Sequence, residues 1–586
     1  MKRRDFLKFG LGGVAGITFG GLTGLPVFRL GDVFATSTNV WKFGVLGDTQ
    51  WTRHQLDSST GTSDLSIDPE GTNPYSVSGS MISQIDAQFV NLGVKFVIQV
   101  GDLTDCGTTR AIQARALMAQ TNLIANGIDF FPIRGNHETY AASYGESSNT
   151  DYSITAMRNA FQQMNGAGVI SGATNFSPAA SVGADCLTYS FDYDNVRFIM
   201  LDTWATGSKV DNNADGYSYG YTVNDHQAWL DQQLDAAARG TGHAFVFAHQ
   251  PLIAEDHQDT MFSGYTNANL DWQNAFYASM AGNNARYFIS GHDHIHQRSL
   301  VRSPDGNSVV EELICASCSN KFYTPQSVTA EKWYGQKDRE TSISQEMYTV
   351  GFYVFTVNGP IVMVDFYSDD RGQWWSDAHY PEGGSGNGTL ITPAFNFVKK
   401  ETWGYSLSES GITTFTVLEG ENYVINTPNT VAKVLKAGGT AKDYTGRSFQ
   451  KPAAAWWADK STVTNADAIS DVVTVLGAAS AAIKENHDSN TNNPNDPVGI
   501  QLSFDPSVSL SRSDINQGRM VTIKTRDENG DWVDAVDKNF GGAKRFVYGP
   551  WNKAYPVGTY GIDNSKHIAW AVVNHDSDFA VIRTGN

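Results

Sequence analysis

Five short polar segments, met in order along the chain, carry the side chains best suited to chemistry. They are Asp48-Thr49-Gln50, Gly101-Asp102, Gly135-Asn136-His137-Glu138, the single His249, and Gly291-His292-Asp293-His294. Two metal cations a few ångströms apart need about eight nitrogen and oxygen donors, including one carboxylate that can bridge the ions. These segments supply such a set, so we expect a two-metal centre.

We expect the donors to divide between the two ions. The division is Asp48 and His294 for one ion, His249, His292 and Asn136 for the other, and Asp102 as the bridge between them. A lone Gly-Asp pair or a single histidine after a strand is usually a turn or a core residue. Five such segments in order favour a site over a purely structural role.

Each polar segment follows a run rich in β-branched and aromatic residues, which predicts a strand. The runs are Trp41 to Leu46, Val94 to Val100, Ile128 to Ile133, Ala244 to Phe247 and Tyr287 to Ile289. Helical patterns lie between several of them, at Ser80 to Leu92, Ala111 to Ala125 and Asp225 to Ala238. This alternation predicts an α/β domain with its site at the carboxyl ends of the strands.

The series of segments resembles the calcineurin-like metallophosphoesterase superfamily, over about residues 41 to 300. The resemblance implies a double β-sheet sandwich flanked by helices, with two metal ions (Mn, Fe or Zn) held by the ligands just named. In such enzymes a hydroxide that bridges the metals attacks phosphorus in line, and the metals neutralise charge on the phosphoryl oxygens. The implied activity is therefore metal-dependent hydrolysis of phosphate monoesters or diesters.

The resemblance also implies an acid for the leaving group. His137 stands beside the ligand Asn136 without being a ligand in the family, and an imidazole suits proton transfer near neutral pH. Asp105 is the candidate carboxylate to hold its other nitrogen. The run from Gly101 to Asp105 resembles the Gly-Asp-x-x-Asp element of protein Ser/Thr phosphatases, and Arg134 to Glu138 resembles their third motif.

Three positions depart from related patterns. Cys106 replaces the arginine that grips phosphate in the Ser/Thr phosphatases, and Asp105 stands where purple acid phosphatases carry a metal-binding tyrosine. Gln50 occupies the position of a histidine ligand, so we expect it to bind the first ion through its amide oxygen, a harder and weaker donor. His54 is an alternative donor, which we interpret as a solvated loop residue instead.

Composition bounds the partners. The chain has 586 residues and a formal net charge of -19, which would repel nucleic acid at long range, so we expect none as a partner. The same acidic excess also serves solubility. We expect a small-molecule or macromolecular phosphate ester as substrate, with Trp51 and Trp204 either shaping the pocket or packing. The competing hypothesis is a non-catalytic exported binding protein that keeps the fold and metal.

Only four cysteines occur in the chain, so the core must come from burial of apolar surface rather than from a disulfide framework. Cys315 and Cys318 form a CxxC pair that either closes as a disulfide outside the cytoplasm or stays reduced in the core. Cys106 and Cys186 are expected to be buried small residues.

The first residues indicate export. Lys2-Arg3-Arg4 precedes a Gly-rich apolar run, which resembles a twin-arginine signal peptide over residues 1–37 with cleavage after Ala35. The alternative is a membrane anchor from Phe9 to Leu30. We expect a periplasmic or extracellular protein without a stable membrane span once processed.

Composition also divides the mature chain. We expect a catalytic domain over residues 40–380, closed by a hairpin at Asn358-Gly359-Pro360, and a mostly β domain over 390–586 after the Gly383 to Gly388 linker. We expect the β domain to cover an edge of the catalytic sheet; the alternative is that it binds a polymer or a partner. Tyr140 to Asp185 reads as a long surface excursion.

Overall fold

The computed structural model describes most of the chain between Val40 and Thr584. The described residues are 40–50, 75–105, 107–139, 151–161, 172–179, 187–203, 211–212, 218–219, 226–257, 259–262, 269–319, 322–326, 337–369, 394–407, 416–417, 422–437, 443, 449, 454–458, 467–478, 497–508, 510–511, 513, 520–527 and 530–584. The expected signal peptide lies outside this part, as do Trp51, His54, Cys106, Cys186 and Trp204.

The first three ligand segments each follow a strand of a six-stranded sheet. Its order is β16-β15-β14-β1-β2-β3, with bounds Trp41–Leu46 (β1), Phe96–Gln99 (β2), Asp129–Pro132 (β3), Gly351–Asn358 (β14), Ile361–Asp369 (β15) and Phe397–Ser406 (β16). Strands β1, β2 and β3 are parallel and almost entirely buried, as expected for strands covered on both faces. The predicted hairpin forms as the antiparallel pair β14 and β15.

The other two ligand segments each follow a strand of an eight-stranded sheet. Its order is β13-β11-β12-β10-β9-β6-β5-β4, with bounds Ala173–Pro178 (β4), Tyr189–Tyr193 (β5), Val196–Leu201 (β6), His243–Ala248 (β9), Ala285–Ser290 (β10), His296–Arg302 (β11), Val309–Ile314 (β12) and Glu340–Glu346 (β13). An aromatic core joins the two sheets. The Phe43 ring lies 4.7 Å from Phe355 within its own sheet and 5.1 Å from Phe198 of the other.

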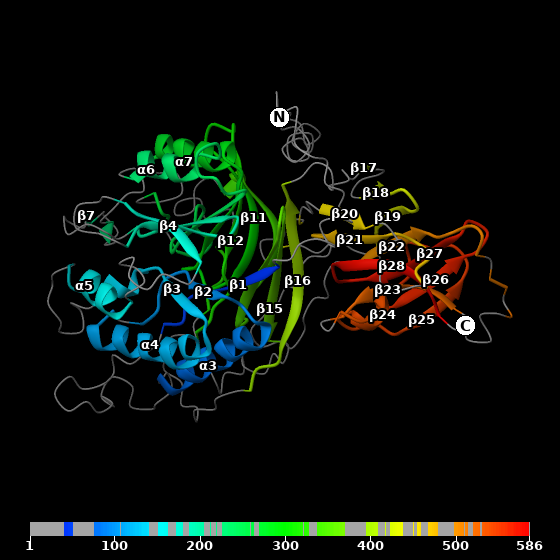
Figure 1. Cartoon of the computed structure of the whole chain (residues 1–586), viewed down its shortest axis with the longest axis horizontal. Coiled ribbons are helices and arrows are strands. Elements are labelled where there is room, and N and C mark those ends of the chain that lie inside the picture. The colour runs from blue at the N-terminus through cyan, green and yellow to red at the C-terminus, as the bar shows by residue number, and fades with distance from the viewer. Residues whose placement is uncertain are drawn as a thin grey trace.

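Helices cover the outer faces of both sheets (Figure 1). Their bounds are Tyr75–Leu92 (α3), Thr109–Asn122 (α4), Asp151–Ala160 (α5), Gln227–Leu234 (α6) and Leu270–Gly282 (α7). Apolar residues of α3 and α4 join the core of the first sheet, and those of α6 and α7 pack on the second. The expected double sheet flanked by helices is therefore confirmed. Among the described helices, none is both long and apolar enough to cross a bilayer.

The segment predicted to be a surface excursion contains regular structure. Helix α5 and the residue that follows it place Ile154, Met157 and Phe161 in the core, and α5 packs beside α4. Their spacing of three and four residues gives one apolar helix face, which the polar residues around it obscured. Strand β4 then pairs with β5 at the edge of the second sheet.

The C-terminal part is mostly β, as predicted, and consists of two further sheets (Figure 1). One has the order β17-β18-β19-β22-β27-β26-β25, and its strands are Thr416–Val417, Tyr423–Asn426, Val431–Lys436, Val498–Ser503, Ile568–Val573, Thr559–Asp563 and Arg545–Tyr548 in that order. The other has the order β20-β21-β28-β23-β24, with strands Ala454–Ala458, Val472–Leu476, Ser577–Thr584, Met520–Arg526 and Trp532–Asp534. Apolar side chains from both sheets form one core.

Strand β16 connects the two parts. It lies beyond the linker expected at Gly383 to Gly388, yet it pairs with β15 and completes the first sheet. Its Glu401 side chain reaches inward to His296 and Arg298 of β11. Outward, the Thr402 carbonyl accepts from the Gly477 amide at 3.3 Å, so the C-terminal part rests against this edge strand.

His243 on β9 makes a polar link between the eight-stranded and the six-stranded sheet. Its Nε2–H donates to the Gly359 carbonyl at 2.8 Å, and its Nδ1 accepts from the Tyr405 hydroxyl at 3.0 Å. Burial lowers the pKa of His243 from 6.5 to about 4, because the site disfavours the imidazolium. The unfolded chain therefore binds this proton at a higher pH than the folded chain does.

We predict that His243 destabilises the fold in mild acid. The stability that it contributes is complete above pH 6.5 and is lost as the pH falls towards the folded pKa of about 4. Between pH 7 and 5 the loss should be about 2 kcal/mol. Urea unfolding of His243→Gln and of the unaltered chain at both pH values measures it. Equal losses in both proteins would contradict the prediction.

Candidate metal centre

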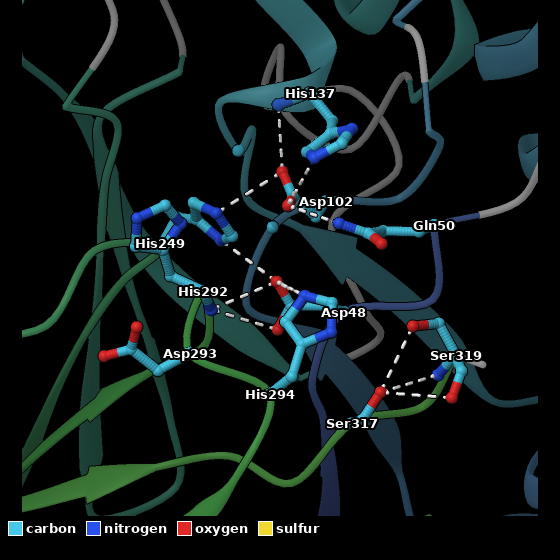
Figure 2. A network of polar contacts seen from close by, with 12 residues as sticks. Asp48, Gln50, Asp102, His137, His249, His292, Asp293, His294, Ser317 and Ser319 are labelled. Carbon is cyan, nitrogen blue, oxygen red and sulfur yellow. Dashed lines mark hydrogen bonds and ion pairs between the residues drawn. The ribbon is translucent and has the colours of Figure 1, made fainter. Parts of the chain in front are cut away.

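The five ligand-bearing turns meet at one edge of the double sheet. Each begins immediately after its strand, with β1, β2 and β3 in the first sheet and β9 and β10 in the second. Parallel strands present their carboxyl ends at the same edge, so side chains from distant parts of the chain converge there. Figure 2 shows Asp48 and Asp102 with the histidines of both sheets around them.

The backbone of these turns adopts conformations that most residues avoid. Gln50, Asp102, His292 and His294 have positive φ angles of 37°, 45°, 75° and 52°. Such conformations cost on the order of 1–3 kcal/mol each and persist where the surrounding structure over-determines them. The fold therefore spends stability on holding these side chains in place.

Glycine precedes several ligands because the turns touch one another. A Cβ atom on Gly135 would lie 2.1 Å from Asp102 Oδ1, and one on Gly291 would lie 2.5 Å from Asp48 Oδ2. Only a residue without a side chain lets each turn approach the carboxylate of another. The Gly-Asn and Gly-His motifs thus reflect the packing of the centre itself.

Two overlapping clusters could each hold a metal ion. Asp102, His249 and His292 form one, and Asp48, Asp102 and His294 form the other, with the candidate ligand atoms of each cluster within 4.8 Å of one another. All five side chains are buried. Asp102 belongs to both clusters, which is where a bridging carboxylate must lie. The grouping agrees with the division expected from the sequence.

Asn136 and Gln50 extend these clusters. Asn136 Oδ1 lies 2.9 Å from His249 Nε2, on the side of the ion expected for Asn136. The Gln50 amide nitrogen donates to Asp102 Oδ2 at 3.0 Å. Its Oε1 is buried without a hydrogen-bond partner among the described residues, which is an acceptor that a cation could satisfy.

The electrostatics of the centre favour positive charge. Burial raises the pKa of Asp102, but His249 and His137 act more strongly in the other direction and hold that pKa well below its ordinary value. Burial lowers the pKa of His249, whereas Asp102 and Asp48 raise it, so that it reaches about 10. The two carboxylates therefore stabilise cations beside them, as bound metal ions would require.

We predict that Gln50→His raises zinc affinity at the first site. An imidazole is a better zinc ligand than an amide oxygen. If Gln50 binds the first ion, its Oε1, which is buried without a hydrogen-bond partner among the described residues, is the atom that the imidazole would replace. The gain should be about tenfold or more, equivalent to about 1.4 kcal/mol. The unaltered site should prefer manganese or iron. Zinc titration of both metal-free proteins measures the effect, and identical affinities would remove Gln50 from the ligand set.

His137 lies at the margin of the centre, with 16% of its side chain exposed. Its Nδ1–H donates to the Asp105 backbone carbonyl at 2.7 Å, and the Asp105 carboxylate is farther away, at 3.4 Å. Nε2 faces the centre, 3.8 Å from Asp102 Oδ2. We expected the Asp105 carboxylate to hold His137, whereas the shortest contact to the His137 ring comes from the Asp105 main-chain carbonyl.

Sequence reasoning missed the roles of Glu138, at the end of the third segment, and of Arg134, directly before that segment. Buried Glu138 accepts from the Thr104 amide at 2.9 Å and the Gly135 amide at 2.8 Å, which ties the turns after β2 and β3 together. Burial, and then Asp102, raises the pKa of Glu138 to about 7. Arg134 makes a bidentate ion pair with Asp202 at 3.0 and 3.2 Å. Both residues belong to the run from Arg134 to Glu138, which resembles the third motif of the Ser/Thr phosphatases. This resemblance was the signal that could have identified them.

The loop after β9 holds residues that carry no sequence signal. His257 packs on the ring of His292 at 4.1 Å, and Asp259 Oδ1 lies 3.1 Å from His292 Nε2. Asp293, between the two ligand histidines, accepts from His257 Nδ1 at 2.9 Å. Neither His257 nor Asp259 follows a strand, so spacing could not have identified them.

The CxxC segment makes backbone hydrogen bonds at two of the ligand-bearing turns. The Cys318 amide donates to the Asp48 carbonyl at 3.1 Å, and the Cys315 amide donates to the Ser290 carbonyl at 2.7 Å. Both thiols are free and buried, and burial raises the pKa of each above its ordinary value. Of the two alternatives, the structure has the reduced pair in the core.

Comparison with known proteins agrees with this geometry. A family model for calcineurin-like phosphoesterases matches residues 42–296, the region that holds every expected ligand, and supports that superfamily. No curated protein sequence matches the chain.

Solved structures show more distant likenesses. A dimetal phosphatase from Danio rerio is 15% identical, with a TM-score of 0.32, over 55% of this chain and 95% of that one. A purple acid phosphatase from yellow lupin is 15% identical, with a TM-score of 0.34, over 59% and 52%. PhoD is 12% identical, with a TM-score of 0.38, over 66% and 73%.

Proposed function

We propose that this protein is an exported, metal-dependent hydrolase of phosphate esters with a two-metal centre. One observation carries the proposal: buried Asp102 belongs to two adjacent ligand clusters, as a carboxylate that bridges two ions must. The match of residues 42–296 to calcineurin-like phosphoesterases supports the same activity.

The ligand set follows from the two clusters. The ions would be held by Asp48, Gln50, Asp102 and His294 on one side, and by Asp102, Asn136, His249 and His292 on the other. Two metal ions bound there would activate water at neutral pH and offset the charge of a phosphoryl group. Mixed oxygen and nitrogen donors suit Mn, Fe or Zn.

The protein's own contribution to the reaction is position and proton transfer. His137 is held at Nδ1 by the Asp105 carbonyl and presents Nε2 to the centre. It is also partly exposed, unlike the five side chains that form the two clusters. From this margin a protonated Nε2 can donate to the leaving oxygen of an ester, which we propose as the role of His137.

A hydrolysis screen tests the function. Metal-free protein is reloaded separately with Mn²⁺, Fe²⁺ or Zn²⁺ and offered nitrophenyl phosphate mono- and diesters. We expect cleavage of at least one class with metal and none after chelation. The class that is cleaved decides between monoesterase and diesterase. Bound metal without any hydrolysis would favour the non-catalytic binding protein instead.

Export is part of the proposal and rests on the paired arginines. We predict that changing Arg3 and Arg4 to Lys leaves unprocessed protein in the cytoplasm, because the twin-arginine route reads this pair. Cell fractionation and the N-terminal sequence of the exported chain measure it. Normal export of the double variant would reject this route, and an exported chain that still begins at Met1 would favour an anchor.

A further inference from the structure

We propose that Asp259 is a positioning residue that fixes the ring of His292 for the ion shared by Asp102 and His249; the inference rests on the function proposed above. Asp259 Oδ1 lies 3.1 Å from His292 Nε2. Both side chains are buried, at 3% exposure each. Asp259 comes from the loop after β9 and His292 from the turn after β10, so the contact joins two ligand-bearing segments.

The contact sets the tautomer of the His292 ring. A carboxylate can only accept, so His292 Nε2 carries the proton and Nδ1 keeps its lone pair for an ion. His249 in the same cluster is arranged the opposite way. Its Nδ1–H donates to the Val100 carbonyl at 2.8 Å, and its Nε2 faces Asn136 and Asp102. The two histidines would therefore bind one ion through different nitrogens.

The Asp259 carboxylate is itself held in place. Gln250 Nε2 donates to Asp259 Oδ2, and Gln250 Oε1 accepts from the Thr203 hydroxyl at 2.7 Å. All three side chains are buried. A buried chain of this kind fixes the rotamer of the carboxylate and, through it, the plane of the His292 ring.

The loop that carries Asp259 is anchored by the other turn. Asp293 accepts from the backbone amides of Glu255 at 2.7 Å and His257 at 2.9 Å. Lys337 pairs with Glu255 at 2.8 Å, and both are buried. The ligand turn thus holds the loop through Asp293, while the loop holds ligand His292 through Asp259. This reciprocity favours a positioning role over a chance contact.

Metal titration of the full chain tests the inference. Metal-free protein is titrated with Mn²⁺, and bound ions are counted. We expect Asp259→Ala to lower the affinity for one of the two ions about 10- to 100-fold and to leave the affinity for the other unchanged. Asp259→Asn keeps an acceptor oxygen and should recover part of the loss. Adding Asp48→Asn to the Ala variant should remove the second ion as well.

The control is Glu312→Gln. Glu312 is buried and accepts from the Leu252 amide at 2.6 Å, so it anchors the same loop without touching a ligand. It should leave both affinities unchanged. The inference would be overturned if Asp259→Ala bound both ions with wild-type affinity. It would also be overturned if Asp259→Ala and Glu312→Gln lowered the affinities for the two ions equally. Failure of the unaltered chain to bind two ions would overturn the proposed function, and this inference with it.

Discussion

Replacement of Asp102 by Ala should remove both metal ions and lower the rate of hydrolysis by on the order of 10³-fold or more. Asp102 is the carboxylate common to both clusters, and His137 and Gln50 also donate to it. In the centre, Asp48 is the other candidate carboxylate, and it belongs to one cluster alone. Without the bridge, neither set of remaining donors should hold an ion tightly.

Metal content per chain and turnover are the measurements for Asp102→Ala. Asp102→Asn is the matched control, because it keeps the shape and one acceptor oxygen but replaces the other oxygen with a donor NH2 group and loses the charge. Asn should retain some of the structural contacts and still lose most metal. If the Ala variant bound two ions per chain, Asp102 could not be the bridge.

His137→Gln should leave both ions bound and slow hydrolysis of esters with poor leaving groups by about 10²–10⁴-fold. Esters with activated aryl leaving groups should be affected far less, since their leaving oxygen needs no proton. His137 contacts the centre through hydrogen bonding and lies outside both ligand clusters. The measurement is the ratio of kcat/KM for an alkyl and a nitrophenyl ester.

Asp105→Asn is the control for the acid assignment. The contact that orients His137 comes from the Asp105 carbonyl at 2.7 Å, which the substitution keeps. We therefore expect a loss of less than about tenfold on both esters. An equal loss on both esters in His137→Gln would remove His137 from the acid role, and loss of metal would assign it a structural one.

The strands and ligand turns could be predicted from the sequence because their signals are local. Strand β1 has the predicted bounds, Trp41–Leu46, since a buried parallel strand is a continuous apolar run. Asp102 and Asn136 each follow such a run directly. Boundaries shifted where a side chain competes with the helix: α6 ends at Leu234, and Asp235 Oδ1 then accepts from the Ala237 amide at 2.9 Å.

The supporting residues could not be predicted because their partners are distant in sequence. Asp259 meets His292 across 33 residues, and Glu401 meets His296 across 105. Strand β16 joins the first sheet after a segment that composition marks as a linker. Pairings of this kind follow from tertiary packing, which periodicity and motif spacing do not encode.

Parallel measurement of bound metal and turnover tests the central claim most directly. Metal-free protein is titrated with Mn²⁺, and hydrolysis of the best ester from the screen is followed at each ratio of metal to chain. We predict that activity rises as occupancy passes from one to two ions per chain and disappears again on chelation. Full activity without metal, or with one ion per chain, would contradict a two-metal hydrolase.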